Sequence, residues 1–224
     1  MNELLIHEHK LYRSAFAESN VDRKWDTVIF TDESTFTSAN DGPVLVYRPQ
    51  GQRYNPQYMS ASKRSGRVSV NCWGWISHEG AGVLHRIEGH LDGLQYQHIL
   101  QNVMVLSVRM LYPDGIIHLQ QDHSSIHDSR VVQERVAQQA DVEILYWLPR
   151  APDMNPTEKM WSEVKTMQET WPVFPPRKSD ELRDLVSDAS DEVATSKHYI
   201  RSLIESMTGR MKSLVEAEGF WTSY

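Results

Sequence analysis

Three carboxylates in this sequence stand at, or shortly after, the end of an apolar stretch. Asp32 closes "VIFTD", Asp122 closes "HLQQD", and Glu158 follows "VEILYWL" in the run "MNPTEKMW". In open α/β sheets, ligands collect at the carboxyl ends of the strands. If the strands that end at Asp32 and Asp122 are parallel neighbours, both carboxylates reach one edge of the sheet. A helix that begins near Glu158 then adds the third carboxylate from the side.

Three clustered carboxylates repel one another unless a cation neutralises them. Hard oxygen ligands of this kind suit Mg²⁺ or Mn²⁺. Two such ions about 3.5–4 Å apart serve phosphoryl transfer, one activating water or a hydroxyl group and the other stabilising the leaving oxygen. We therefore predict that Asp32, Asp122 and Glu158 are catalytic and bind two metal ions. The competing interpretation is structural, because an aspartate at a strand end is often a turn residue.

The stiff corner "APDMNPTEKMW", residues 151–161, sets Asp153 and Glu158 around two prolines. A helix cap and a metal site both explain such a corner. With Asn155 as N-cap, Pro156 takes the first helical position and Glu158 the third, which is a capping-box pattern with the favoured proline. Such a cap contributes about 1 kcal/mol. The two interpretations are compatible, since the cap fixes the helix start while the Glu158 carboxylate faces the metals.

The first half of the chain has the pattern of an antiparallel meander. Four stretches are apolar or alternate between apolar and polar residues, and glycine or asparagine turn signals separate them. These predicted strands cover residues 25–36, 42–49, 66–80 and 82–89.

The period then changes to that of a helix over residues 92–111, where Asp92 and Gln95 resemble a capping box. The expected inward side chains of this helix are Leu94, Ile99, Val103, Leu106 and Met110. A strand, a helix and a strand follow, and this order favours parallel pairing. They are predicted at 115–122, 129–140 and 142–148, with a further helix at 157–169.

We divide the chain into a helical lead-in at 1–20, a catalytic domain at 21–172 and a helical tail at 173–224. The proline-rich run "WPVFPPRKSD" marks the last boundary. Beyond it, the spacing of apolar residues predicts one or two amphipathic packing helices. A meander followed by a strand–helix–strand unit fits an α/β fold with a ribonuclease H-like mixed sheet, flanked by helices and extended by the C-terminal helices.

Net charge limits the nucleic-acid contacts that the chain can make. It is −7, so no basic field covers the whole molecule, and any DNA contact must rest on local basic patches or bound cations. One such patch lies beside several tyrosines and is the candidate for tracking phosphates, although a solvated hairpin face explains it equally well. Its candidate DNA-contacting residues are Arg48, Arg53, Lys63, Arg64 and Arg67.

Cys72 is the single cysteine, so we expect a buried reduced thiol and no internal disulfide. No apolar run approaches the roughly 20 residues of a membrane helix, and the start of the chain has no signal-peptide pattern. We expect an intracellular, soluble protein without a membrane partner.

Three blocks together resemble the catalytic motifs of the Tc-one/mariner superfamily of DDE transposases. They are "FTDES", "QQD" with a histidine after it, and "APDMNPTEKMW". The third block is the most specific, and it matches the family at Pro152, Asp153, Asn155, Pro156, Glu158 and Trp161. The stretches "VYRPQGQRYNP" and "VSVNCWGWIS" extend the resemblance over residues of about 10 to 175.

The resemblance implies a ribonuclease H-like fold and cut-and-paste DNA transposition in a nucleus. It assigns Asp32, Asp122 and Glu158 as the metal-binding triad, with Mg²⁺ or Mn²⁺ as cofactor. The implied reaction is hydrolysis at the transposon ends followed by attack of the freed 3′ hydroxyl on target DNA. DNA is the implied partner, and a homodimer assembled on DNA is the implied state.

The sequence departs from the family in its second block, which normally reads Asp-Asn-x-Pro-x-His. Here His123 and Ser125 replace the asparagine and the proline, while His127 remains. The candidate residues around the metal ligands are His123, His127 and Asn155, since groups that orient ligands typically change activity about 10–100-fold. His123 either hydrogen-bonds as the asparagine would, competes for metal, or, as we expect, sits exposed.

Two functional hypotheses follow. The first is an active DDE catalytic domain, which the intact trio of carboxylates favours. The second is a decayed or co-opted remnant that keeps the fold without cleaving DNA. The altered second block favours it, as does the absence from this sequence of the paired helix-turn-helix domains that relatives carry upstream. A ribonuclease H-like nuclease of another kind is disfavoured by the "PDMNPTE" run.

Overall fold

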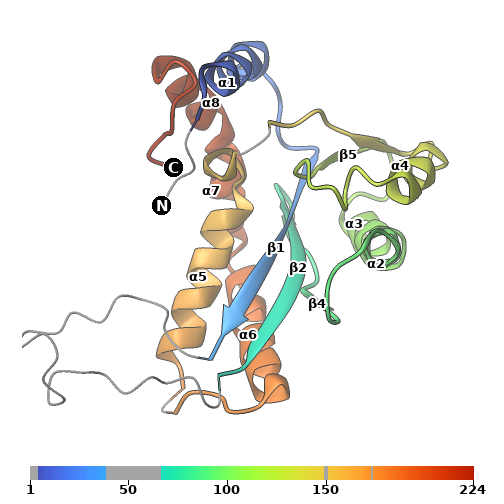
Figure 1. Cartoon of the computed structure of the whole chain (residues 1–224), viewed down its shortest axis with the longest axis vertical. Helices are drawn as coiled ribbons and strands as arrows, with labels where there is room; N and C mark the ends of the chain where they lie inside the picture. The colour runs from blue at the N-terminus through green and yellow to red at the C-terminus, as the bar shows by residue number, and fades with distance from the viewer. Residues whose placement is uncertain (1–4, 39–66, 149–150, 173) are drawn as a thin grey trace, which may run out of the picture.

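The computed structural model describes residues 5–38, 67–148, 151–172 and 174–224. A mixed sheet forms its centre, in the order β3-β2-β1-β5-β6, with β4 pairing on β2 (Figure 1). The strands are β1 Val28–Thr37, β2 Ser69–Ser77, β3 Gly80–Ala81, β4 His85–Ile87, β5 Ile117–Gln120 and β6 Val142–Ile144.

The strand directions agree with the predicted mixed sheet. β2 runs antiparallel to β1, and both β3 and β4 run antiparallel to β2. β5 is parallel to β1 and to β6, as expected for the strand–helix–strand unit. The predicted strand at 42–49 lies outside the described residues, and the strand predicted at 82–89 is confined to His85–Ile87. The ribonuclease H-like fold class is therefore confirmed.

Helices cover both faces of this sheet (Figure 1). In Figure 1, α5 lies along one side of the β1–β2 pair, and α2, α3 and α4 lie on the other side. Helix α6 packs against α5 and belongs to the same core. The helices are α1 His7–Asn20, α2 Gly93–Ile99, α3 Val105–Leu111, α4 Arg130–Ala137, α5 Thr157–Thr170, α6 Ser179–Thr195, α7 Lys197–Glu205 and α8 Met207–Glu216.

Alternation along β1 divides the buried side chains into two cores. Phe30 packs in one core, together with side chains of α5 to α8, whereas its neighbour Ile29 packs in the other core with side chains of α2 to α4. Successive residues of a strand face opposite sides of a sheet. Asp32 therefore shares the face of Phe30 and looks toward α5, while Glu33 shares the face of Ile29.

The helix predicted at 92–111 is interrupted by a π-helical segment, Leu100–Met104. Its buried side chains are Tyr96, Ile99, Leu100, Met104 and Val108. Leu94, Leu106 and Met110, which we expected to face inward, are exposed.

For Leu106 and Met110, which follow the π segment, that phase error has a simple geometric cause, whereas Leu94 precedes the segment. A π turn spends one more residue per turn than an α turn, so it rotates every later side chain around the axis. The hydroxyl group of Ser107 accompanies the interruption, donating to the carbonyl oxygens of Val103 and Met104. At the helix start, the Asp92 carboxylate accepts a hydrogen bond from the backbone nitrogen of Gln95 at 2.8 Å, as predicted. The Gln95 side-chain amide, however, donates to the carbonyl oxygen of Glu88.

The C-terminal residues form three helices where we expected one or two. Leu182 and Val186 of α6, and Ile200 of α7, are fully buried in the same core as Phe30. Helix α8 packs beside α1, so both ends of the described chain lie together (Figure 1). The domain limits at 20 and 172 stay a prediction.

Across the residues that the structure describes, none of the helices combines the length and the apolar character needed to cross a membrane.

Candidate active site

The register of two parallel strands brings Asp32 and Asp122 to the same level. Phe30 of β1 pairs with Gln120 of β5, and each aspartate stands two residues beyond its member of this pair. Side chains two residues apart share a face of the sheet. Asp32 and Asp122 therefore leave neighbouring strands on the face that α5 covers.

Asn155 fixes the start of α5 against β1. Its amide oxygen accepts a hydrogen bond from the backbone nitrogen of Thr157 at 3.2 Å, and its amide nitrogen donates to the carbonyl of Thr31 at 3.4 Å. The Asn155 side chain thus caps the first turn, as predicted. The second bond of the capping box, between the Glu158 carboxylate and the Asn155 backbone nitrogen, is not formed, because that nitrogen donates to the carbonyl of Pro152. The Glu158 carboxylate is left to face the sheet edge.

The three predicted carboxylates line one cavity of about 130 Å³. The Thr157 hydroxyl reaches across the cavity side of α5 and donates to the Asp32 carboxylate at 3.3 Å. The lining consists of Asp32, Gln120, Asp122, Trp147, Leu148, Ala151, Pro152, Asn155 and Glu158. The segment after β6, which we predicted to continue as a strand to residue 148, instead supplies one wall of this cavity.

Negative charge accumulates in this cavity. Burial raises the pKa of the Asp32 carboxyl well above its usual range, and repulsion from Glu158, Glu33 and Asp122 raises it further. Partial loss of water around the Glu158 carboxyl raises its pKa as well, against the opposing charge of Lys165. Carboxylates with raised pKa values favour a proton or a cation beside them.

His127 balances part of this charge from the opposite side of Asp122. Its Nδ1 lies 2.6 Å from a carboxylate oxygen of Asp122 and its Nε2 lies 3.2 Å from Glu33. Burial lowers the pKa of His127, but the hydrogen bonds to Asp122 and Glu33 outweigh it and raise that pKa to about 10. Burial raises the pKa of Asp122, but the hydrogen bond and the charge of His127 outweigh burial and bring that pKa below its usual value.

Two residues of this arrangement were not predicted from the sequence. Glu33 follows Asp32 in the chain, and strand alternation turns it to the other face, where it meets His127. Tyr96 stacks against the His127 ring at 4.1 Å between centroids, and its hydroxyl donates to the amide oxygen of Gln121 at 2.8 Å. The alternation of "FTDES" was the available signal for Glu33, whereas nothing local marked Tyr96.

His123 is exposed, as we expected, and its ring also makes two polar contacts. Its Nε2 lies 2.9 Å from the carbonyl oxygen of Trp147, and its Nδ1 lies 3.2 Å from Asp128. The ring is not among the residues that line the carboxylate cavity. Of the three roles considered for His123, hydrogen bonding is the one that its geometry matches.

Among the described residues, no three His, Cys, Asp or Glu side chains are arranged as a ready-made metal site. The position of Asp122 accounts for this, because its carboxylate is drawn to His127 and is mostly exposed at the rim. The three carboxylates thus border one cavity without converging on a point.

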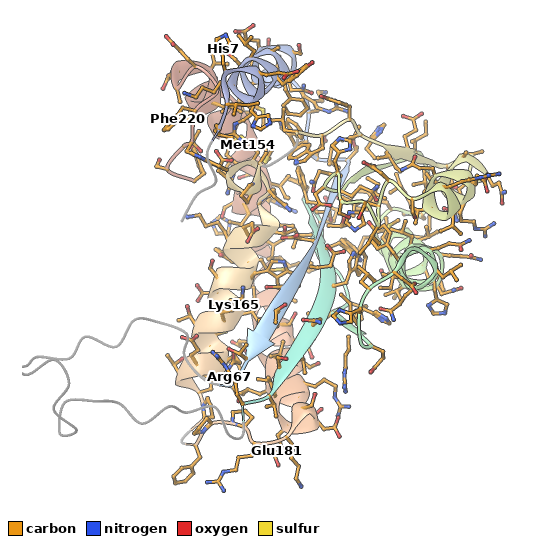
Figure 2. All side chains as sticks on the ribbon, in the orientation of Figure 1. His7, Arg67, Met154, Lys165, Glu181 and Phe220 are labelled. Carbon is orange, nitrogen blue, oxygen red and sulfur yellow. The ribbon has the colours of Figure 1, made fainter. Side chains whose placement is uncertain are left out.

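The basic candidates fall mainly outside the structure. Arg48, Arg53, Lys63 and Arg64 lie outside the described residues. Arg67 is exposed just before β2, and Figure 2 shows it at the end of the β1–β2 pair that lies away from Met154 and the start of α5.

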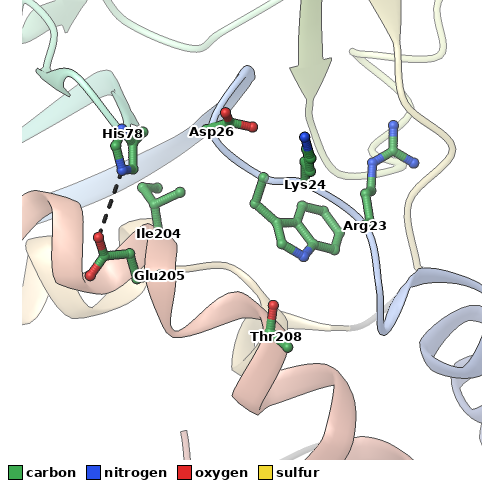
Figure 3. Close-up of a pocket in the computed structure, with 8 residues that line it drawn as sticks. Arg23, Lys24, Asp26, His78, Ile204, Glu205 and Thr208 are labelled. Atoms are coloured by element: carbon green, nitrogen blue, oxygen red, sulfur yellow. Dashed lines mark ion pairs between the residues drawn. The ribbon is translucent and has the colours of Figure 1, made fainter.

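A second cavity, of about 340 Å³, lies between the start of β1 and the helices α7 and α8 (Figure 3). Its lining mixes cations with anions, and His78 pairs there with Glu205 at 3.7 Å. None of the three predicted carboxylates borders it. The cavity at the carboxyl ends of β1 and β5 is therefore the candidate active site.

Comparisons with known proteins agree with this location. The family model described as DDE superfamily endonuclease matches residues 27–176, which include all three carboxylates. The Tcb1 transposase of Caenorhabditis briggsae is 32% identical over 90% of this chain and 72% of the relative. The Tc1 transposase of Caenorhabditis elegans is 29% identical over 97% of this chain and 78% of the relative.

Solved structures show the same fold. The catalytic domain of Mos1 mariner transposase superposes with a TM-score of 0.73 at 12% identity, covering 100% of both chains. The Mos1 mariner paired-end complex with Mn gives a TM-score of 0.79 at 14% identity, where this chain spans 66% of the Mos1 chain. With the family model and the related sequences, these findings show that the chain belongs to the DDE superfamily endonucleases and is a transposase catalytic domain of the Tc1/mariner type.

Proposed function

We propose that Asp32, Asp122 and Glu158 are the catalytic and metal-binding residues of this transposase domain. The observation that carries the proposal is their shared cavity, which three distant parts of the chain build together. Their chemistry suits cleavage of a phosphodiester, because that reaction depends on positioning and on neutralising charge rather than on a covalent intermediate.

The cavity suits a hard divalent cation, and we propose two ions of Mg²⁺ or Mn²⁺. All three proposed ligands are carboxylates, the hard oxygen ligands that such cations prefer, and burial raises the pKa values of Asp32 and Glu158. Mos1 structures named for bound Mn and bound Mg support the same choice. Bound there, the ions would neutralise the carboxylates and stabilise the charge that develops on the phosphate.

The surrounding side chains hold the trio in place. The imidazolium of His127 orients Asp122, while Glu33 and Tyr96 fix the position of the imidazole ring. Asn155 sets the first turn of α5, from which Glu158 projects. Residues that orient ligands in this way typically change activity about 10–100-fold.

The altered second block does not make the remnant hypothesis the better one. His123 replaces the family asparagine, yet its ring is hydrogen-bonded to the carbonyl of Trp147, a residue of the cavity lining. The loop after Asp122 is thereby tied to the opposite wall. His127, whose side chain pairs with the Asp122 carboxylate, is retained and buried.

The proposed substrates are transposon-end DNA for hydrolysis and target DNA for strand transfer. The printed names of the related transposases and of the Mos1 paired-end complex with left transposon end support DNA as the partner. Action as a homodimer on DNA and a nuclear location complete the proposal. Light scattering of the chain with and without end DNA tests the dimer.

A cleavage assay on nicked or end-mimicking DNA tests the proposal. The wild-type chain should cleave only with Mg²⁺ or Mn²⁺, and Asp32→Asn should lose activity by at least about 10³-fold, as expected when a central catalytic group is removed. Asp141→Asn is the matched control, because that carboxylate lies far from the cavity and pairs with Arg109. Equal cleavage by wild type and Asp32→Asn would refute the assignment.

A further inference from the structure

Gln120 is a buried amide that the fold leaves without a partner. Its side chain is 0% exposed, and neither its amide oxygen nor its amide nitrogen has a hydrogen-bond partner among the described residues. Gln121, the next residue, is also buried, but its amide oxygen accepts from Tyr96 at 2.8 Å. An unsatisfied buried amide destabilises a fold, so such a group calls for an explanation.

Gln120 is one of the residues that line the carboxylate cavity. Gln120 and Asp122 share a face of β5, two residues apart, which corresponds to roughly 6–7 Å along an extended chain. Gln120 is fully buried, whereas the Asp122 side chain is 61% exposed. The amide therefore sits at the floor of the cavity, and Asp122 stands at its rim.

The cavity that Gln120 lines has room for small polar ligands. Its volume is about 130 Å³, and a water molecule occupies about 30 Å³ in the liquid. A buried water needs two to four polar partners. The Gln120 amide and the carboxylates of Asp32 and Asp122 are polar groups of the same lining.

We propose that Gln120 positions the water molecule that attacks the DNA, an inference that rests on the proposed function. The amide oxygen accepts a hydrogen bond from the water. A lone pair of the water oxygen is then directed toward the rim, where the phosphate is bound. The water oxygen forms the new bond to phosphorus, and the bond from phosphorus to the 3′ oxygen breaks. The proton that the water loses ends on that 3′ oxygen.

This role separates the two reactions of a transposase. Hydrolysis uses a free water molecule, which a protein group must position. Strand transfer uses a 3′ hydroxyl group that the bound DNA strand itself carries. Both reactions use the same carboxylates and cations. A residue that holds the water should therefore affect hydrolysis alone, whereas damage to the carboxylates lowers both reactions together.

Gln120→Leu, a substitution of similar volume, tests the proposal in the full chain. Hydrolysis of intact end DNA should fall about 10–100-fold, as for other orienting groups. Strand transfer of pre-cleaved ends uses the 3′ hydroxyl of the DNA and no water. It should therefore stay within about twofold of wild type, which is a small free-energy difference. The urea midpoint should rise or stay unchanged, since an unsatisfied buried amide is replaced by an apolar group.

Trp73→Phe is the matched control. The indole nitrogen of Trp73 is also buried and unpartnered within the described part of the chain, but it belongs to the core on the other face of the sheet. This variant should keep both reactions at the wild-type level.

Equal loss of hydrolysis and strand transfer in Gln120→Leu, or no loss of hydrolysis, would overturn the role of Gln120. A lowered urea midpoint would also overturn it, because the amide would then have partners in the fold. A wild-type chain that performs neither reaction with Mg²⁺ or Mn²⁺ would instead refute the proposed function, and the urea midpoints would still decide whether the amide is unsatisfied.

Discussion

Asp32 and Asp153 belong to two of the three sequence blocks that carry the candidate site, and their surroundings are opposite. The Asp153 carboxylate is 8% exposed and receives hydrogen bonds from Arg13 at 2.6 Å and from the backbone and hydroxyl group of Thr222 at 3.2 Å each. The Asp32 carboxylate accepts a hydrogen bond from the Thr157 hydroxyl group, and its pKa is raised by burial and by repulsion from Glu158, Glu33 and Asp122. Asp153 therefore stabilises the fold, whereas Asp32 is held close to groups of the same charge.

We call the surroundings of Asp153 the clasp, formed by Arg13 of α1, the turn at Asp153, Arg210 of α8 and the segment 219–224. Arg210 donates to the Asp153 carbonyl at 2.6 Å, and Arg13 donates to the Gly219 carbonyl at 2.9 Å. Both arginines are at most 2% exposed. Aromatic rings of the segment lie against cations in the pairs Lys10–Phe220, Arg13–Trp221 and Arg210–Tyr224.

The contrast shows how the same short block serves stability and chemistry. Asp153 and Glu158 stand five residues apart around the proline corner, and the clasp holds the first while leaving the second at the cavity. Asp153 is neither a helix cap nor a cavity residue, so neither explanation offered for the corner applies to it. Charge repulsion is tolerated at Asp32 because the clasp and the shared core hold the surrounding elements.

Breaking the clasp should have the largest effect on stability. Asp153→Ala leaves Arg13 buried with its charge uncompensated, which typically costs about 3–5 kcal/mol. Urea unfolding of the metal-free chain measures the loss. Asp141→Ala is the control, because the Arg109–Asp141 pair has a similar 2.5 Å distance but an Asp141 side chain that is 51% exposed. Such an exposed pair contributes about 0–1 kcal/mol, and equal losses in both variants would remove the contrast.

Binding of a divalent metal in the carboxylate cavity should stabilise the folded chain. Mn²⁺ at 100 times its dissociation constant should raise the free energy of unfolding by about 2.7 kcal/mol. Asp32→Asn should lose this gain, and without metal it should be more stable than wild type, because repulsion with Glu158 and Asp122 is removed. Asp141→Asn should keep the full gain. Loss of stability in metal-free Asp32→Asn would contradict the picture of a repulsive site.

A glycine of the clasp offers a finer test of its packing. Gly219 has φ +77°, and a Cβ built there would lie 2.0 Å from the carbonyl oxygen of Lys10. Gly115 has φ +87° with open space around it, so its change to alanine carries only the backbone strain of about 1–2 kcal/mol. Gly219→Ala should cost about 1–3 kcal/mol more, as overpacking does. Thermal unfolding of both variants checks the difference, and equal costs would mean that the segment yields.

The sequence was sufficient to predict the carboxylate cavity because its signals are local. Asp32 and Asp122 each end an apolar strand, and parallel pairing then requires them to meet. The clasp had no local signal, since Arg13 and Asp153 are 140 positions apart and Arg13 lies on a helix that reads as charged and exposed. Only packing of α1 against α8 makes that arginine a buried group.

Other errors came from rotation of a helix and from the choice between faces. The π segment at Leu100–Met104 changed which residues face the core, and no propensity in that run distinguishes a π turn from an α turn. Glu33 was not predicted because strand alternation places it on the face of the sheet opposite to Asp32.

Labelling of Cys72 gives the smallest effect and reports on both regions at once. The thiol is buried in the core that α5 to α8 share with β1, and burial raises its pKa to about 12. Because the pKa is raised, the neutral thiol dominates, and the thiolate that reacts is about one part in 10⁴ at pH 8. A disulfide reagent should therefore modify the native chain only through opening of this core. Asp153→Ala should label faster than wild type, and metal-free Asp32→Asn should label no faster. Rapid labelling of the wild-type chain at pH 8 would mean that the core opens without loss of the clasp, and the clasp would then not be what keeps this core closed.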